Sequence, residues 1–178
     1  MNEVELIALS PVRFAELADA PAVNDALVAA FAREAAAPDT RRTHHFAGRY
    51  ENTYIGLERI PELVPVHAFA LQAARRVLGR DNLRQGFWFN EMHPGQRTTA
   101  HDHTGGDELL SGVYYVNCPA ESGRLVLHDD EAVITVTPRP GLLVLFPPDL
   151  PHEVEEHRGQ GIRLSVAFNF GPPAEPAT

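Results

Sequence analysis

The sequence predicts an α+β protein that is mainly β, with N-terminal helices packed on one sheet of a jelly-roll-like barrel. Helical spacing of apolar residues is confined to the first half of the chain, and short apolar runs separated by turn residues fill the second half. The 178 residues are 44% hydrophobic, which is enough to bury a sizeable core. We therefore expect residues 1–178 to form a single domain: a mainly helical support over 1–85, a barrel over 86–170 and a tail over 171–178.

Two helices are expected before the barrel. The first begins near Pro21, where a proline is tolerated in the first turn, and ends before Pro38. The second runs from Pro61 to about Leu78, and Gly79 supplies its C-terminal stop. Each helix has an apolar face that can pack on a sheet. The residues of these faces are Val23, Leu27, Ala30 and Phe31 in the first helix, and Leu63, Val66, Ala70, Ala74 and Val77 in the second.

Residues 41–57, which separate the two helices, are rich in Arg, His, Tyr and Asn and show no clear periodicity. We interpret them as a solvated connector. The alternative is a lid that presents cations such as Arg41, Arg42 and Arg49 to a substrate, because loops on rigid scaffolds often carry recognition residues.

Eight short strands are expected from Gly86 onward, separated by turns rich in Gly and Pro. Strands of this number and spacing favour two packed four-stranded sheets, as in a jelly roll. The expected ranges are 86–92, 97–101, 109–117, 124–128, 132–137, 141–146, 152–156 and 162–170.

The last of these strands has two clearly different faces. One face is wholly apolar and belongs against the helices, so the face that carries Arg163 and Ser165 must look into the barrel. A buried guanidinium is costly without an anionic partner, and few acidic residues are placed to serve as one. A bound carboxylate is therefore the natural occupant. The apolar face consists of Ile162, Leu164, Val166, Phe168 and Phe170, and the other of Arg163, Ser165, Ala167 and Asn169.

Composition excludes several classes of function and predicts a cytoplasmic protein. The net charge is −9 and no block of Lys and Arg occurs, which argues against nucleic-acid binding. The single Cys118 cannot form an internal disulfide, which favours a reducing compartment. The N-terminus lacks the features of a signal peptide, and no apolar run approaches the ~20 residues that cross a bilayer.

Three histidines form the clearest candidate site. His101 and His103 are two residues apart, so in a strand both would point to the same side while Asp102 faces away. His152 follows a turn at the start of a later strand and can complete a three-point metal clamp. Neutral imidazole suits iron, copper, nickel and zinc alike. We interpret the other six histidines as surface, turn or hydrogen-bonded residues; they are His44, His45, His67, His93, His128 and His157.

Other acidic residues are less suited to be ligands. Asp107 and Glu108 follow a Gly-Gly turn and are expected in a loop, and Asp129 and Asp130 look like a hairpin tip. The sequence has no Ser-His-Asp or Cys-His arrangement, no glycine-rich phosphate loop and no Cys pair for structural zinc.

Residues 86–170 resemble the Fe(II)/2-oxoglutarate-dependent oxygenases, and specifically the small bacterial 2OG-Fe(II) oxygenases. Four blocks in order carry the resemblance over nearly half the chain. They are the His-x-His element at 101–103, the Leu-Ser-Gly-Val-Tyr-Tyr-Val strand at 110–116, the Gly-Leu-Leu-Val-Leu-Phe-Pro run at 141–147 that leads to His152, and the Arg-Leu-Ser-Val-Ala-Phe-Asn run at 163–169.

The resemblance implies a double-stranded β-helix in which His101 and His152 bind iron. It implies that Arg163 and Ser165 bind the distal carboxylate of 2-oxoglutarate. Asn90 resembles the Asn of alkylation-repair oxygenases that contacts the same co-substrate, and its alternative role is that of a hydrogen-bonding residue at a strand end. Most of the superfamily has His-x-Asp or His-x-Glu, so His103 stands where a carboxylate is usual. Since His103 fills the position that halogenases leave open for halide, halogenation is not expected.

The function expected is that of an Fe(II)- and 2-oxoglutarate-dependent dioxygenase. Such an enzyme would hydroxylate a small molecule or an amino-acid or peptide side chain with dioxygen, forming succinate and CO2. Two alternatives remain open: a three-histidine cupin-type iron dioxygenase that does not use 2-oxoglutarate, and a metal-binding module without catalysis. No nucleic-acid or membrane partner is expected, and the oligomeric state is left open, with a homodimer as one option.

Overall fold

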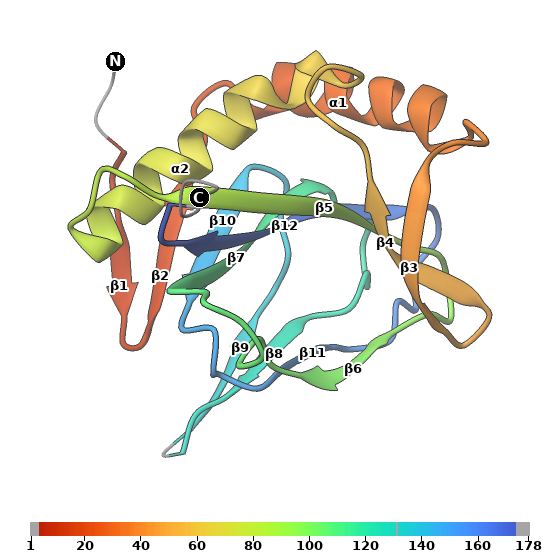
Figure 1. Ribbon diagram of the computed structural model, residues 1–178. Helices are drawn as coiled ribbons and strands as arrows, with labels where there is room; N and C mark the ends of the chain where they lie inside the picture. The colour runs from red at the N-terminus through yellow and green to blue at the C-terminus, as the bar shows by residue number, and fades with distance from the viewer. Residues whose placement is uncertain (1–3, 131, 174–178) are drawn as a thin grey trace.

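Two antiparallel sheets face each other, and two helices lie across the outer side of the larger one (Figure 1). This computed structural model describes residues 4–130 and 132–173. The architecture is the expected double-stranded β-helix, mostly β with two α-helices. The strand order is β1-β2-β10-β7-β12-β5-β4-β3 in the larger sheet and β6-β11-β8-β9 in the smaller one. The strands are β1 (Ile7–Leu9), β2 (Val12–Glu16), β3 (Arg41–Phe46), β4 (Arg49–Tyr54), β5 (Arg84–Met92), β6 (Thr98–His101), β7 (Leu110–Asn117), β8 (Leu125–His128), β9 (Val133–Val136), β10 (Leu142–Phe146), β11 (His152–Val154) and β12 (Arg163–Gly171).

Both expected helices are present. The first is α1 (Ala20–Ala35), and the second begins with a 3-10 turn, η1 (Pro61–Leu63), that leads into α2 (Val64–Leu78). Gly79 has a φ of 62°, a left-handed conformation that glycine adopts without strain and that ends α2. The buried faces of the helices pack on the apolar face of β12, whose Leu164, Val166, Phe168 and Phe170 are buried. Val23 and Val77 of the predicted helix faces are only partly buried.

All eight expected strands are present, with bounds within two residues of the prediction. Ile162 was expected on the buried face of the last strand, but it precedes β12 and is 40% exposed. Because it lies before the strand, Ile162 does not share the alternation that buries this face. The expected tail begins one residue late, because β12 extends to Gly171, and residues 174–178 lie outside the described part of the chain.

The eight expected strands do form two sets of four, β10-β7-β12-β5 and β6-β11-β8-β9, but the prediction was wrong in that the first set belongs to an eight-stranded sheet. The four additional strands come from the N-terminal region that was expected to be mainly helical. Of these, β2 pairs with β10 and buries Val12 and Ala15. With only two buried residues in five, this strand carries too short an apolar pattern to be recognised in the sequence.

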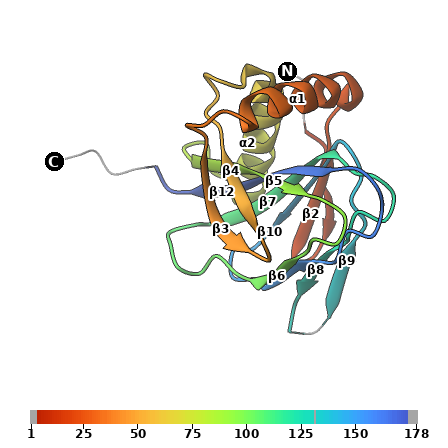
Figure 2. The same ribbon diagram turned by 90° about the vertical axis from the view of Figure 1, so that its right-hand side faces the viewer.

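Residues 41–57 were expected to be a solvated connector, and this was also wrong, because β3 and β4 form a hairpin. The two strands meet at a two-residue turn, Ala47-Gly48, in which both φ angles are positive, as tight β-hairpins require. His44, within β3, also has a positive φ of 59°. Backbone pairing joins the hairpin to β5 at Thr53 and Phe89, and the hairpin stands over one open end of the barrel (Figure 2).

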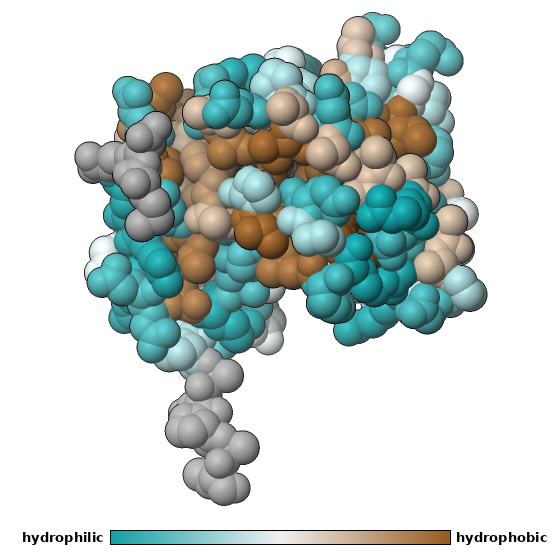
Figure 3. Space-filling view, turned by 90° about the horizontal axis from the view of Figure 1, so that it is seen from above, coloured by the Kyte–Doolittle hydropathy of each residue, from teal (hydrophilic) through white to brown (hydrophobic). Residues whose placement is uncertain are grey.

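The view from above looks down on the helical layer, where hydrophobic residues show between hydrophilic ones near the centre of the face (Figure 3). Neither α-helix in the described part of the chain is both long and apolar enough to span a bilayer.

A second apolar cluster, in addition to the one between the helices and the larger sheet, lies inside the barrel between the two sheets. It includes Val12, Tyr115, Leu125, Leu127, Val144 and Phe146. The candidate site opens beside this cluster.

Candidate metal centre

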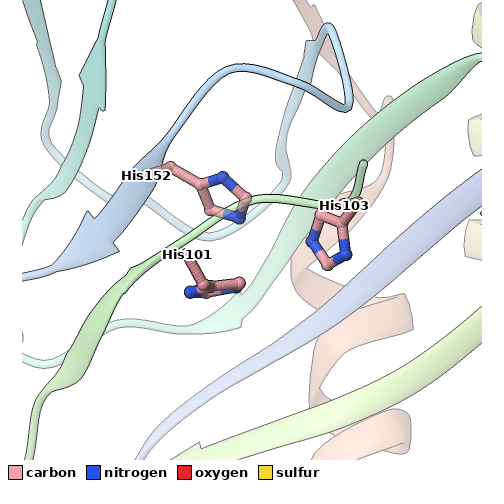
Figure 4. A group of neighbouring side chains, drawn as sticks. All are labelled: His101, His103 and His152. Atoms are coloured by element: carbon pink, nitrogen blue, oxygen red, sulfur yellow. The ribbon is translucent and has the colours of Figure 1, made fainter. Parts of the chain in front are cut away.

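The three predicted histidines come together in the structure. His101 ends β6, His152 begins β11, and His103 lies in the loop after β6. One ring nitrogen from each lies within 4.8 Å of the other two, and the three rings turn toward a common point (Figure 4). The partner strands explain this meeting, because β6 and β11 pair antiparallel with His101 opposite His152.

Backbone carbonyls set the orientation of two of the rings. The Nδ1 atom of His101 lies 2.8 Å from the carbonyl oxygen of Thr99, and Nδ1 of His152 lies 2.9 Å from that of Leu150. A carbonyl can only accept a hydrogen bond, so Nδ1 must carry the proton in each ring. Nε2 is then left with a free lone pair, the form in which imidazole binds a metal.

His103 reaches the site for a different reason from the one predicted. The prediction placed it on the same strand face as His101, but β6 ends at His101. The backbone N–H of His103 donates to the carbonyl of Pro148 at 2.8 Å, which ties it to the loop that leads to His152. Asp102 is not one of the converging ligands. Its carboxylate accepts hydrogen bonds from the backbone N–H and the hydroxyl of Thr104.

Burial keeps two of the imidazoles in the neutral form. His152 is only 6% exposed, and desolvation lowers its pKa to about 4. Desolvation also lowers the pKa of His103, with a smaller contribution from His101. At neutral pH both rings therefore keep the lone pairs that a cation needs.

A cavity of about 550 Å³ extends from the histidines to Arg163 inside the barrel. Arg163 is 2% exposed, and within residues 4–130 and 132–173 it has no carboxylate partner. Its Nη1 lies 3.3 Å from the Ser165 hydroxyl oxygen and 3.5 Å from Met92 Sδ, while its Nε has no hydrogen-bond partner. Arg163 and Ser165 thus occupy the interior position predicted for them, and the charge of Arg163 is uncompensated.

Tyr115 is a residue of this cavity that sequence reasoning missed. Its ring lies 5.2 Å from the Arg163 guanidinium carbon, and its buried hydroxyl has no hydrogen-bond partner. Burial raises the pKa of Tyr115 to about 12, so the hydroxyl is a donor at neutral pH. Tyr115 lies two residues after Val113 in β7, and residues two apart in a strand share a face, so this spacing could have indicated that both side chains line the cavity.

Asn90 also lines the cavity, but its amide faces the hairpin. Its Nδ2 donates to the Glu51 carbonyl at 2.8 Å and to the Asn52 side-chain oxygen at 3.2 Å. The amide nitrogen has two hydrogens, and these two bonds use both of them.

His44 is the one histidine interpreted as a surface residue that the structure places in the cavity lining. Within the described ranges, the other five lie outside that lining. The hairpin contributes His44, Glu51, Asn52 and Tyr54 to the wall, but neither Arg41 nor Arg42. Arg41 instead stacks over Tyr54, with its guanidinium carbon 4.6 Å from the ring centre.

The fold and the site define a class: a double-stranded β-helix with a cluster of histidines and a buried cation between its two sheets. Residues 87–171 match the family model described as the 2OG-Fe(II) oxygenase superfamily. The matched segment runs from β5 to the end of β12 and holds all three histidines and Arg163. It covers a little less than half of the chain.

Solved structures share the fold over most of their length. A prolyl-4-hydroxylase from Pseudomonas putida is 20% identical, with a TM-score of 0.60 over 90% of this chain and 88% of that one. EvdO2 from Micromonospora carbonacea var. aurantiaca, solved with 2-oxoglutarate, is 15% identical, with a TM-score of 0.65 over 98% and 96%. The epimerase SnoN, solved with Fe3+, alpha-ketoglutarate and nogalamycin RO, is 15% identical, with a TM-score of 0.67 over 89% and 78%. The search of curated proteins found no match.

Residues 87–171 are therefore similar to the 2OG-Fe(II) oxygenases, which are oxidoreductases, and the solved structures show the same fold. The activity that this similarity indicates is that of an Fe(II)- and 2-oxoglutarate-dependent dioxygenase, which would use iron as cofactor, 2-oxoglutarate as co-substrate and dioxygen as the second co-substrate. The donor atoms fit the iron, because three imidazole nitrogens converge. The unpartnered Arg163 Nε and Tyr115 hydroxyl fit the carboxylate of the co-substrate.

Proposed function

We propose that His101, His103 and His152 hold Fe(II), and that Arg163, Ser165 and Tyr115 bind the distal carboxylate of 2-oxoglutarate. The observation that carries this proposal is the buried, uncompensated guanidinium of Arg163 in the same cavity as the histidines. Iron, 2-oxoglutarate and dioxygen together supply the oxidising chemistry and leave succinate and CO2 as products. Asn90 serves in this proposal as a support of the hairpin, since its amide hydrogens are already used.

The residues of the chain have distinct tasks in this scheme. Arg163 neutralises one end of the co-substrate, and the Ser165 and Tyr115 hydroxyls donate to the same carboxylate. The carbonyls of Thr99 and Leu150 keep the Nε2 atoms of His101 and His152 available to the metal. Trp88 and Tyr54, whose ring centres are 6.4 Å apart, supply an aromatic wall where the substrate would lie.

The reaction proposed is the hydroxylation of a small molecule or of an amino-acid or peptide side chain, in the cytoplasm. The single Cys118 supports the reducing compartment. A three-histidine dioxygenase that does not use a keto acid is the alternative, and it would have no use for the cation and hydroxyls opposite the histidines. An anaerobic titration with Fe(II) and 2-oxoglutarate separates the two. We expect a visible metal-to-ligand charge-transfer band, and its absence would favour the alternative.

Replacing Tyr115 with Phe is expected to weaken 2-oxoglutarate binding by about 10–150-fold, because a hydrogen bond to a charged group contributes roughly 1.5–3 kcal/mol. The ring and its contact with Arg163 remain, so iron affinity should not change. Isothermal titration of the Fe(II)-loaded protein measures both. Equal affinities for the variant and the parent would remove Tyr115 from the carboxylate site.

The pH dependence of iron binding should follow the burial of His152. A ligand imidazole must be neutral, and protons compete with the metal only near the pKa of the ring. Burial lowers the pKa of His152 from 6.5 to about 4, so this ligand stays available through mildly acidic solution. We expect Fe(II) affinity to fall as the pH decreases, with half-release below pH 6.5. Anaerobic dialysis between pH 8 and pH 4 checks this, and half-release above pH 6.5 would contradict it.

A further inference from the structure

The strand that carries His101 has little support from its own sheet. β6 has four residues and lies at the edge of the smaller sheet, where it pairs with β11 alone. Even this pairing is irregular, because the register shifts between His152 and Val154. An edge strand with one interrupted partner is poorly fixed along its free side. His101 lies only three residues beyond Thr98, at the end of this strand.

A buried arginine from the hairpin contacts the start of this strand. Arg49 is the first residue of β4 and is 9% exposed. Its Nη2 lies 3.1 Å from the carbonyl oxygen of Arg97 and 3.2 Å from the Thr98 hydroxyl, at the start of β6. Its Nη1 donates to the carbonyl of Glu91 in β5 at 3.3 Å. One side chain therefore connects the hairpin, the larger sheet and the strand of His101.

The charge of Arg49 is balanced locally, unlike that of Arg163. Glu51, two residues along β4, lies 3.1 Å from Arg49 Nη2. Because removing two charges from water costs about as much free energy as their attraction returns, the ion pair itself adds little to the stability of the folded protein. A guanidinium does, however, present several donors in a fixed plane, which lets it reach carbonyls on two strands at once. This geometry favours positioning as the reason for the residue.

We propose that Arg49 is a positioning residue of the metal centre, which fixes the start of β6 and so the place of His101. This inference rests on the proposed function for the metal itself. Arg49 donates two side-chain hydrogen bonds to the start of β6, and within the described residues no side chain from another element donates to it. Outer-shell partners of this kind typically change metal affinity by about 10–100-fold.

The test compares Arg49→Met and Arg49→Lys with the parent. Arg41→Met is the matched control, because Arg41 belongs to the same hairpin and contacts Tyr54 but not β6. Anaerobic Fe(II) affinity and amide hydrogen exchange of residues 97–101 in the metal-free protein are measured for each. We expect Arg49→Met to lose about tenfold or more in Fe(II) affinity and to exchange faster over 97–101. Arg49→Lys should recover part of the loss, and Arg41→Met should match the parent.

Unchanged affinity and exchange in Arg49→Met would overturn the proposal. Should Arg49→Met fail to fold, Thr98→Val decides, because it removes one acceptor of the Arg49 guanidinium and leaves the hairpin intact. A smaller loss of Fe(II) affinity with faster exchange would support the proposal, and no change in either would overturn it. If the parent protein itself binds no Fe(II), the proposed function fails, while the exchange comparison still tests whether Arg49 fixes β6.

Discussion

Replacing His103 with alanine is expected to lower Fe(II) affinity by about a hundredfold or more, because ligand loss should exceed the 10–100-fold effect of losing an outer-shell partner. One of three converging imidazoles is removed, and within the described chain no carboxylate lies among them to take its place. His103→Asp should still bind Fe(II), since two histidines and a carboxylate form the common non-haem iron site. Anaerobic titration of the metal-free protein measures all of these affinities.

Asp102→Ala is the matched control, because it changes the residue between the two histidines. The Asp102 carboxylate accepts hydrogen bonds from Thr104 and is not among the converging ligands, so the variant should keep the Fe(II) affinity of the parent. The opposite pattern, an empty site in Asp102→Ala and a full one in His103→Ala, would mean that the centre uses a carboxylate after all.

Arg163→Leu is expected to weaken 2-oxoglutarate binding by a hundredfold or more and to leave Fe(II) binding nearly unchanged. Removing one partner of a buried charge pair typically costs ~3–5 kcal/mol, which corresponds to more than about a hundredfold in affinity. Leucine fills much of the space that the arginine stem occupied, so the core beside Tyr115 should remain packed. Calorimetric titration of the Fe(II)-loaded variant with 2-oxoglutarate gives the affinity.

Arg158→Leu serves as the control for this experiment, because Arg158 is an exposed arginine in the loop before β12. Its loss should change neither affinity. Parental keto-acid affinity in Arg163→Leu would show that Arg163 is not the carboxylate partner.

Much of the barrel could be predicted from the sequence because several of its strands are buried. Continuous apolar runs such as 142–146 are buried throughout, and Gly and Pro separate them cleanly. The hairpin could not be predicted in this way, because four of the six residues of β3 are exposed. Its pairing depends on backbone bonds and a tight turn, which leave no apolar period to detect.

The candidate site, too, could be predicted from the sequence only in part. The spacing of His101 and His103, and the apolar and polar faces of the last strand, were enough to predict the histidine cluster and the interior position of Arg163. The role of Arg49 depends on its contacts with Arg97 and Thr98, which lie 48 and 49 residues further along the chain, and no local sequence pattern reveals such contacts. The Tyr115 hydroxyl is hidden in the same way, inside a run that reads simply as a buried strand.

The left-handed conformation of His44 has a consequence for association between molecules. β3 is one of the two edge strands of the eight-stranded sheet, and a regular, exposed edge of this kind is a template for pairing with another chain. The positive φ of His44 interrupts the strand, whose register pairs Thr43 with Asn52 and His45 with Tyr50 but omits His44. Charged Arg41 and Arg42 stand at its start. The edge is therefore irregular and cationic, two features that protect a sheet against edge-to-edge aggregation.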